Sequence, residues 1–354
     1  MTEKIDFKVG FALTLTIMGF LMSILVFSMS YKAHQRAYPE AQTIVQGEQK
    51  VSFIAVGDIM LSRIVARQVE KSANPNWMWE NITHFLQGSD FNFGNLESPT
   101  NGTPTYSYEE TMIFNAPPAN IGTLSNMNFG VINLANNHAL DQGELGLKTT
   151  QKLLNDRGII HIGTGENLEE AWSPRIIEKN GIKIAFIGAS YASINDNGST
   201  SNNFIARMQD LGKLKSALEE AKEKSDYIIV SMHGGREYTR TPTELQNTFA
   251  HAAIDNGADM VIGGHPHWTQ GTEFYKGRYI FYSLGNFVFD QDFSPETKTG
   301  ITIKVFLIQR NGKTKLDKIE LYPIEIDNYG QPRLISGEAK KKAINDIGLI
   351  NDIL

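Results

Sequence analysis

Two histidines, His265 and His267, flank Pro266 directly after the apolar segment 260–262. Imidazole is the commonest protein ligand for transition metals, and a loop stiffened by proline can direct two rings at one point. The two glycines before His265 would let a metal or a phosphate approach the backbone. An H-x-H pair alone is more often coincidence than a site. The pair therefore predicts a metal site only if other parts of the chain supply further ligands.

Four other apolar segments also end in polar side chains of metal-binding types. We expect buried strands at 51–56, 90–97, 129–134 and 227–232 because of their apolar composition. Parallel strands of an open α/β sheet end at a common edge, where such sheets bind ligands. One such residue could equally cap a turn or a helix, but a series of strand ends is hard to explain in that way. The residues at these four ends are Asp58, Glu97, Asn137, His138 and His233.

The candidate ligands combine carboxylate, amide and imidazole groups. This mixture of oxygen and nitrogen donors suits one or two divalent ions of Mn, Fe or Zn. The chain has no cysteine, which removes disulfides, zinc–thiolate sites and cysteine nucleophiles. Its net charge of −6 gives no electrostatic case for binding nucleic acid.

Alternating strands and helices are expected to position these residues, which predicts an α/β fold with a parallel or mixed sheet. Helical patterns are found in 77–86, 117–127, 143–156, 211–224 and 243–256. Further strands are expected at 159–162, 175–178, 183–188, 272–275, 279–282, 299–308 and 318–324. Asn180-Gly181 predicts a tight hairpin, and the charged tail from Ser336 predicts a loose helix.

The N-terminal segment predicts a membrane anchor. Residues 9–29 are uncharged and almost wholly apolar, and a helix of this length reaches roughly 30 Å, the thickness of a bilayer core. The alternative is a cleaved signal peptide, whose apolar region usually has only ~7–15 residues. We expect a cytoplasmic tail at 1–8, a transmembrane span at 9–30 and a polar stalk at 31–50. The flanking charges nearly balance, but a lone N-terminal anchor most often places the following chain outside the cell.

Six motifs together resemble the CapA family, whose members take part in capsule and poly-γ-glutamate synthesis. They are GDIM, GNLE, ANNH, HGGREY, GHPH and YSLGNF, beginning at Gly57, Gly94, Ala135, His233, Gly264 and Tyr282. The resemblance covers residues 51–310 and leaves 311–354 as a C-terminal strand and charged tail. The family is similar to calcineurin-like metallophosphoesterases, which implies a four-layer α-β-β-α sandwich. It also implies an extracellular domain that works with the membrane, an anionic polymer such as poly-γ-glutamate, and other subunits of a membrane synthase complex.

The resemblance implies a first metal position formed by Asp58, Glu97 and His267. Glu97 would bridge to a second metal, where the phosphoesterases have a shorter aspartate. Met60 stands where those enzymes have a histidine ligand, and a thioether is a poor ligand for hard ions. The first position has therefore lost one ligand.

The resemblance also implies a second metal position, formed by Asn137, His233 and His265 together with Glu97. His138 would protonate a leaving group. Because this position keeps all its ligands, we expect either one tightly bound ion and a second, looser one, or a single ion. We therefore predict that His265→Ala costs more bound metal than His267→Ala.

Two other motif positions have alternative interpretations. Glu237 would supply the missing ligand or act as a catalytic base, or would instead form a salt bridge with Arg236 or a neighbouring cation. The loop 283–286 would orient the metal-binding histidines, or would be a packed turn in which Asn286 caps the backbone. We expect the remaining histidines of the domain to fill core or surface positions, namely His84, His161 and His251.

These observations support three functions of different kinds. The first is a membrane-anchored component of capsule polymer synthesis or export with a metal-dependent hydrolase- or transferase-like site. The second is an extracellular metallophosphoesterase acting on phosphate esters. The third is a non-catalytic scaffold that binds the anionic polymer, which the presence of Met60 in a ligand position favours. The motifs alone do not distinguish a γ-glutamyl amide from a phosphate ester.

Overall fold

The N-terminal unit of the chain is described only in part. The computed structural model describes residues 17–30, 32, 48–108, 111–191 and 203–346, and its contacts separate two units, Met1–Gly47 and Glu48–Leu354. Residues 17–30 are helical, and their large apolar side chains are exposed. The tail 1–8, the start of the predicted span and most of the stalk lie outside the described residues. In the part that is described, no helix has both the length and the apolar composition needed to cross a membrane.

The second unit contains an eight-stranded mixed sheet, which we call the first sheet. Its strands are β1 (Gln49–Ile59), β2 (Phe91–Leu96), β3 (Phe129–Asn133), β4 (Ile160–Ile162), β11 (Asn286–Val288), β12 (Thr299–Arg310), β13 (Lys313–Asp327) and β14 (Gln331–Leu334). The order is β14-β13-β12-β1-β2-β3-β4, and β11 pairs with the end of β1. Strands β1 to β4 are parallel, whereas β12, β13 and β14 are antiparallel to their neighbours. The sheet therefore continues beyond residue 310.

A six-stranded sheet, the second sheet, is built around four parallel strands. Its strands are β5 (Arg175–Lys179), β6 (Ile182–Ser190), β7 (Tyr227–His233), β8 (Met260–Gly264), β9 (Thr272–Tyr275) and β10 (Arg278–Phe281), in the order β5-β6-β7-β8-β10-β9. Hairpins add the two antiparallel edge strands. At the first hairpin Asn180 and Gly181 have φ values of 52° and 79°, as a tight turn of this kind requires. The predicted hairpin is confirmed.

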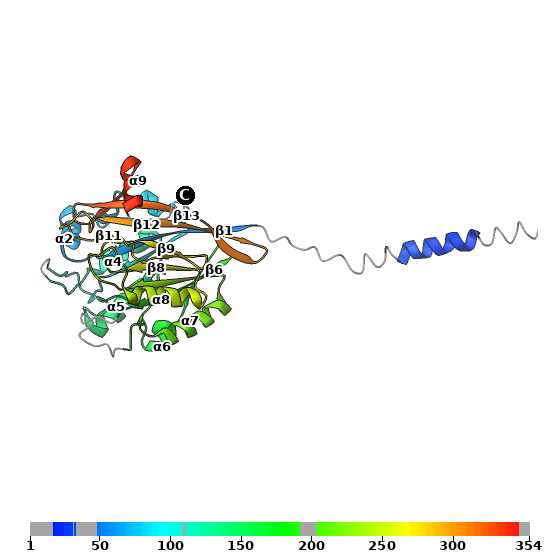
Figure 1. Ribbon diagram of the computed structural model, residues 1–354, viewed down its shortest axis with the longest axis horizontal. Helices are drawn as coiled ribbons and strands as arrows, with labels where there is room; N and C mark the ends of the chain where they lie inside the picture. The colour runs from blue at the N-terminus through cyan, green and yellow to red at the C-terminus, as the bar shows by residue number, and fades with distance from the viewer. Residues whose placement is uncertain (1–16, 31, 33–47, 109–110, 192–202, 347–354) are drawn as a thin grey trace, which may run out of the picture. The chain divides into compact units, whose positions relative to one another are not determined.

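The two sheets pack face to face and are covered by helices on their outer faces (Figure 1). Between them lies an apolar core that contains Phe53 and Phe93 of the first sheet and Phe186 of the second. The helices of the first outer layer are α2 (Arg63–Ser72), η1 (Trp77–Trp79), α3 (Thr83–Leu86), α4 (Pro118–Gly122), η2 (Thr123–Met127) and α5 (Gly143–Asn155). Those of the second are α6 (Leu168–Trp172), α7 (Leu211–Lys224) and α8 (Glu244–Asp255). This gives the expected α-β-β-α order of layers.

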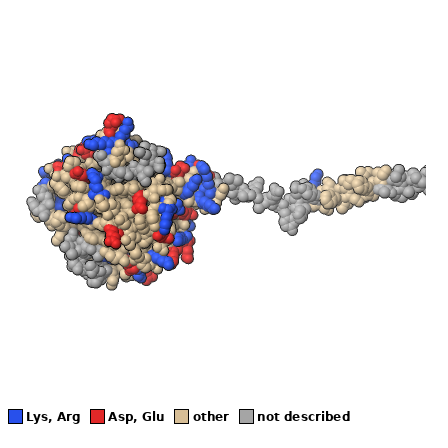
Figure 2. Space-filling model, in the orientation of Figure 1, with Lys and Arg blue, Asp and Glu red and all other residues tan. Residues whose placement is uncertain are grey.

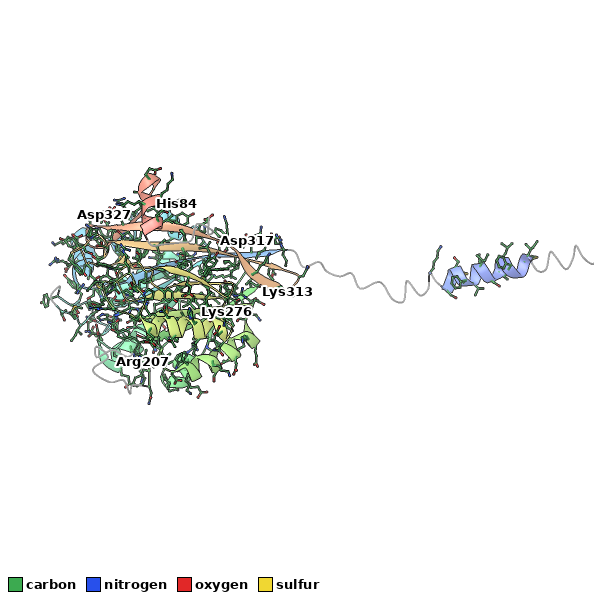
Figure 3. The ribbon with its side chains drawn as sticks, viewed as in Figure 1. His84, Arg207, Lys276, Lys313, Asp317 and Asp327 are labelled. Atoms are coloured by element: carbon green, nitrogen blue, oxygen red, sulfur yellow. The ribbon has the colours of Figure 1, made fainter. Side chains whose placement is uncertain are left out.

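The C-terminal helix α9 (Gly337–Asp346) lies against β13. Lysine, arginine and acidic side chains are interspersed on the face of the second unit seen in Figure 2. Strand β13 illustrates this mixture, since it carries both Lys313 at its start and Asp317 further along, which Figure 3 labels. Mixed charges of this kind keep a surface soluble without creating a strong field of one sign.

Several element boundaries differ from those expected. The predicted helix 77–86 is divided into η1 and α3, and the predicted helix 117–127 is divided into α4 and η2 at Gly122. Glycine destabilises a helix interior by about 1 kcal/mol relative to alanine, which explains the second division. Helices α2 and α6 and the short strands β11 and β14 were not expected. Their sequences are too short or too polar to show a clear period.

Candidate metal centre

Strands from both sheets end at one place. Asp58 lies near the end of β1, and Glu97 directly follows β2. His233 is the last residue of β7, and His265 follows the end of β8. All six predicted metal ligands are buried: Asp58, Glu97, Asn137, His233, His265 and His267. The structure thus brings the predicted residues together at the carboxyl ends of two sheets.

The first predicted position is a compact cluster. Ligand atoms of Asp58, Glu97 and His267 all lie within 4.8 Å of one another. Asp58 Oδ2 accepts a hydrogen bond from the backbone N–H of His265, at 3.0 Å. A Cβ at Gly264 would lie 2.4 Å from Asp58 Oδ1, so only glycine leaves room for this carboxylate. Gly264 therefore makes room for the Asp58 side chain, and not for a metal or phosphate as expected from the sequence.

The second predicted position contains atoms that have no partner. Asn137 Oδ1 lies 2.8 Å and Glu97 Oε1 3.4 Å from His233 Nε2. Ligands about 2.1 Å from one ion and at right angles would lie about 3 Å apart, so these distances suit a shared ion. Glu97 Oε2 and His265 Nδ1 are buried and have no hydrogen-bond partner among the described residues. Because a buried unpaired polar atom costs about 1–3 kcal/mol, both atoms fit the role of metal ligand.

The backbone of the histidine loop is strained. His265 and His267 have φ values of 97° and 59°, in the left-handed region that favours glycine. Arg63 and Tyr238, beside the same centre, have φ values of 45° and 58°. Such residues cost about 1–3 kcal/mol each and are concentrated at functional sites. The strain supports a functional role for the loop.

Asn95 holds the centre together, although it was not predicted. Its amide nitrogen donates to Asp58 Oδ1 at 2.8 Å and to Glu97 Oε1 at 3.1 Å. Its amide oxygen accepts hydrogen bonds from the side chains of Asn133, at 2.9 Å, and Asn136, at 3.2 Å. These two donors fix the amide so that its nitrogen faces the carboxylates. Asn95 precedes Glu97 by two positions on β2, and this period of two was the available signal.

Burial controls the electrostatics of the centre. It raises the pKa of Asp58 to about 6 and that of Glu97 well above its usual value, and the neighbouring Asp58 charge raises the latter further. Burial also lowers the pKa of His267 to about 4, and lowers those of His233 and His265 strongly. The centre thus has neutral imidazoles and carboxylates that lack a compensating cation. A divalent ion would reverse this penalty by stabilising the ionised carboxylates.

His138 belongs to a neighbouring dyad. Its Nδ1 lies 2.8 Å from Asp141 Oδ2, and burial raises the pKa of Asp141. The ring of Phe114 stacks on the imidazole with centroids 4.0 Å apart, and its backbone N–H donates to Asp141 Oδ2 at 2.6 Å. His138 therefore follows the predicted ligand Asn137 in the sequence, and its ring is held by Phe114 on one face and by Asp141 at Nδ1.

A buried ion pair supports this dyad. Arg63 pairs with Asp290, and its guanidinium lies 4.8 Å from the centroid of the Phe114 ring. The carboxylate of Asp290 also accepts the backbone N–H of Ile64 at 3.1 Å. Neither charged residue was predicted, because the two are 227 positions apart in the sequence.

We expect Asp290→Ala to destabilise the protein by about 3–5 kcal/mol, because it leaves the buried Arg63 guanidinium without a counter-charge. Urea unfolding followed by circular dichroism would measure this loss. Glu144→Ala, which breaks an exposed ion pair with Lys148, is the control and should change the free energy of unfolding by less than about 0.5 kcal/mol. Equal losses for the two variants would contradict the prediction.

Met60 supplies no ligand. Its side chain is buried in the core between the first sheet and its helices, and its sulfur accepts the backbone N–H of Ser62 at 3.1 Å. The fourth ligand that the phosphoesterase pattern has at this position is therefore missing from the first cluster.

The two alternatives for Asn286 are both present. Its Oδ1 lies 2.9 Å from His267 Nδ1, and its amide nitrogen donates to the backbone carbonyl of Thr297 at 2.9 Å. The Nδ1–H of His267 is thereby held by Asn286, which leaves Nε2 as the ligand nitrogen. Glu237 is half-buried, and the described residues show no ion pair between it and Arg236. Its charge helps to raise the pKa of Glu97, so it lies within electrostatic range of the centre.

The other histidines of the domain lie outside the centre, as expected. His84 is exposed (Figure 3). His251 contacts the carboxylate of Glu273 at 2.9 Å and stacks on Tyr275 at a centroid distance of 4.0 Å. His161 is buried in β4, and its Nδ1 has no hydrogen-bond partner among the described residues.

The burial of His161 leads to a pH prediction. Burial, followed by the nearby Arg175 charge, lowers its folded-state pKa from 6.5 to about 4. Below pH 6.5 the unfolded chain binds a proton here that the folded chain does not, so folding stability falls as the pH drops towards 4. The loss should reach about 3 kcal/mol. His161→Gln should flatten this part of the stability profile in urea titrations at pH 7 and 4.5, whereas His84→Gln should not; parallel profiles for all three proteins would refute the prediction.

These features define a two-sheet α/β protein with a buried carboxylate–imidazole centre of the metal-binding kind. Residues 52–291 match the model of a family described as bacterial capsule synthesis protein PGA_cap. The chain therefore belongs to this capsule synthesis family, and the resemblance to CapA is confirmed.

Two curated relatives illustrate the similarity. Capsule biosynthesis protein CapA of Bacillus anthracis is 30% identical over 320 residues, covering 88% of this chain and 75% of that protein. PGA biosynthesis protein CapA of Bacillus subtilis (strain 168) is 30% identical over 333 residues, covering 92% and 83%. Among solved structures, calcineurin-like phosphoesterase YfkN from Bacillus subtilis matches 85% of this chain and 97% of its own, with 17% identity and a TM-score of 0.46.

Proposed function

We propose that this chain is a membrane-anchored component of poly-γ-glutamate-type capsule synthesis or export, with a metal-dependent hydrolase- or transferase-like site. The observation that carries the proposal is the buried donor set, in which Glu97 Oε2 and His265 Nδ1 have no partner among the described residues. Membership of a capsule synthesis family supports the biological setting. The relatives in two Bacillus species are named for capsule and PGA biosynthesis, which supports the polymer.

The proposed location rests on the sequence. The apolar segment 9–30 anchors the chain in the cell membrane in a single pass, and the folded unit lies outside the cell. There it contacts the anionic polymer and other membrane subunits of a synthase complex. The apolar composition of residues 9–29 and their lack of charge support this arrangement.

Six side chains would hold one or two ions of Mn, Fe or Zn. In the first group, ligand atoms of Asp58, Glu97 and His267 lie within 4.8 Å of one another. In the second group, Glu97 and Asn137 contact His233, and the ring of His265 lies 4.9 Å from that of His233. Such an ion supplies a Lewis acid for a phosphoryl or acyl oxygen and lowers the pKa of water towards ~7.

The neighbouring residues supply proton transfer and orientation. Because Asp141 holds His138 at Nδ1, the Nε2 atom of this ring is the one that gives a proton to a leaving group. Phe114 excludes water from one face of the ring, which fixes the direction of that proton. Glu237, half-buried near Glu97, is a second candidate for proton transfer.

The proposal is tested in a capsule-producing cell that carries variants of the full chain. Asp58→Ala and His138→Ala should abolish polymer output, whereas His251→Ala should leave it unchanged, because His251 lies outside the centre. Metal analysis of the purified proteins should find Mn, Fe or Zn in the wild type and little in Asp58→Ala. A wild type without metal, or full polymer output from both active-site variants, would contradict the proposal.

A non-catalytic scaffold is the second candidate, and the environment of Met60 favours it. The sulfur contacts the backbone of Ser62 instead of completing a ligand set. Normal polymer output from both Asp58→Ala and His138→Ala would support the scaffold. A metallophosphoesterase remains the third, and metal-dependent hydrolysis of p-nitrophenyl phosphate that His233→Ala abolishes would support it.

A further inference from the structure

Arg236 differs from every other arginine that the structure describes. Its side chain is exposed and has no ion pair, hydrogen bond or ring contact among the described residues. The other arginines in the described ranges all have at least one such interaction. The guanidinium has five N–H donors, and in an exposed side chain without a protein partner these donors face water. Arg236 therefore has its full donor capacity available.

The backbone of Arg236 lies near the predicted metal centre. It lies between the ligand His233 and Tyr238, whose ring is 6.0 Å from that of the ligand His267. Successive Cα atoms are about 3.8 Å apart, so Arg236 is within about 11.4 Å of the His233 backbone. The half-buried Glu237 follows it directly.

The backbone around Arg236 is held on both sides. Before it, the N–H of Gly234 donates to the carbonyl of Gly264 at 3.2 Å. After it, the N–H of Tyr238 donates to the carbonyl of Pro266 at 2.9 Å, and the Gln270 side chain donates to the carbonyl of Thr239 at 3.0 Å. The segment is thus fastened to the loop that carries the ligand histidines. Because the backbone is already fixed, binding a ligand would order only the Arg236 side chain, at a cost of about 0.5–1.5 kcal/mol.

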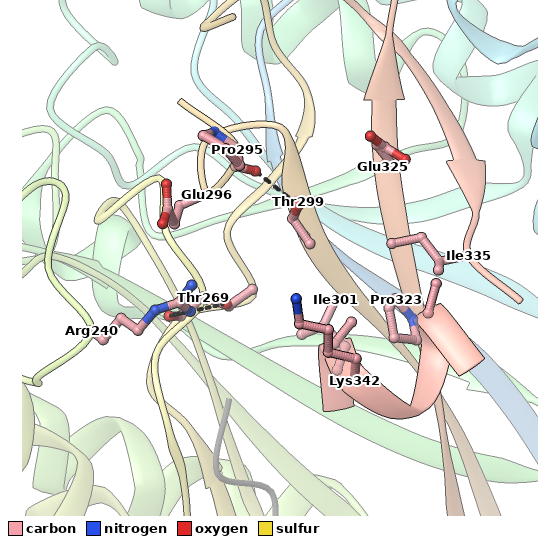
Figure 4. Close-up of a pocket in the computed structure, with 13 residues that line it drawn as sticks. Arg240, Thr269, Pro295, Glu296, Thr299, Ile301, Pro323, Glu325, Ile335 and Lys342 are labelled. Atoms are coloured by element: carbon pink, nitrogen blue, oxygen red, sulfur yellow. Dashed lines mark hydrogen bonds between the residues drawn. The ribbon is translucent and has the colours of Figure 1, made fainter. Parts of the chain in front are cut away.

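Arg240, on the same segment, has a different environment. Its guanidinium donates to the Thr269 hydroxyl at 3.1 Å and lies over the Trp268 ring. It lines a cavity of about 450 Å³ beside α9, to which none of the predicted metal ligands contributes (Figure 4). The two arginines of this segment therefore differ. Arg240 is bound at a separate cavity, whereas Arg236, nearer the centre in the sequence, has no side-chain partner among the described residues.

The charge near Arg236 suggests what this side chain could bind. The half-buried Glu237 directly follows Arg236 and is acidic, so it would repel an anionic substrate whose charge nothing nearby neutralised. Guanidinium binds carboxylate and phosphate groups through two parallel hydrogen bonds. Salt weakens such contacts at an exposed site.

We infer that Arg236 is a substrate-binding residue that holds an oxyanion of the substrate, a carboxylate or a phosphate, at the mouth of the metal centre. This inference rests on the proposed function for the identity of the substrate, a polymer with repeated carboxylates. Arg236 is not a metal ligand, so its loss leaves the metal content unchanged.

The test measures binding by the purified full chain. Fluorescent oligo-γ-glutamate is the probe for carboxylate, and competition by inorganic phosphate distinguishes the two oxyanions. Arg236→Gln should weaken binding of the probe by about 10-fold to 100-fold, and Arg236→Lys should weaken it less, because lysine keeps the charge but not the planar fork. Arg157→Gln is the matched control, since Arg157 is exposed and its guanidinium donates only to the backbone carbonyl of Leu153 among the described residues.

The outcomes separate this inference from the proposed function. Weaker probe binding by Arg236→Gln, with wild-type metal content, supports it; strong competition by phosphate then assigns phosphate as the preferred oxyanion. The same weakening in a chain that proves to contain no metal would refute the metal centre and keep the anion site. Equal binding by Arg236→Gln and Arg157→Gln, or no binding of either anion by the wild type, would overturn the inference.

Discussion

Glu97→Gln will remove most of the bound metal and abolish the thermal stabilisation that metal gives to this protein. Glu97 contributes to both predicted positions, since its carboxylate clusters with Asp58 and His267 and also lies 3.4 Å from His233 Nε2. An ion present at a thousand times its Kd stabilises the folded chain by about 4 kcal/mol. A neutral amide binds divalent ions more weakly than a carboxylate, so the variant loses this contribution.

Elemental analysis and thermal melts with and without EDTA would measure the effect of Glu97→Gln. The wild type should melt several degrees lower after EDTA treatment, whereas the variant should show the same Tm in both conditions. Glu273→Gln is a matched control, because Glu273 also pairs with a histidine but lies outside the centre. A wild-type metal content in Glu97→Gln would show that the carboxylate is not a ligand.

His265→Ala will cost more bound metal than His267→Ala. The second position has four donors and includes the unpartnered Nδ1 of His265, whereas the first has three and receives nothing from Met60. Loss of His265 therefore removes a ligand from the position expected to bind more tightly. We expect His267→Ala to keep the ion of the second position, and His265→Ala to lose at least half of the metal.

Elemental analysis after dialysis against a fixed concentration of Mn²⁺ would compare these two variants. His251→Ala should retain the wild-type content. Equal losses in His265→Ala and His267→Ala would refute the asymmetry, and a larger loss in His267→Ala would reverse it in favour of the compact first cluster.

The sequence was most informative where strands end. Asp58, Glu97 and His233 could be placed together because apolar segments precede them and because parallel strands share an edge. Strand composition was clear enough for most of both sheets to be expected. Strand order was not predictable, since β1 pairs with β12, a strand that lies far from it in the sequence.

The supporting residues were not identified from the sequence, although Asn95 lies two positions before Glu97 and so shares its period. Asn95 acts through its amide geometry, and a buried strand contains other asparagines, such as Asn92, that bond backbone carbonyls instead. Arg63 and Asp290 become partners only when the fold brings distant segments together. The alternation of polar and apolar residues in the sequence indicates which polar side chains are buried, but it does not indicate which of them contact one another.

The division of the helix expected at 77–86 is explained by a tertiary contact. Trp79 is buried and its indole N–H donates to Thr123 at 2.8 Å, so the chain turns at this point to satisfy a tertiary contact. An amphipathic pattern predicts the helix, and packing against a neighbouring segment then overrides it.

The ligands of the centre come from the ends of strands in both sheets. Neither sheet alone could form the complete predicted site during folding, so we expect tight metal binding only after one sheet has docked on the other. Contacts between such distant segments form slowly because long loops must close first. The time at which metal binding appears during refolding should therefore report on the last stage of assembly. We expect a nascent chain not to bind the ion before that stage.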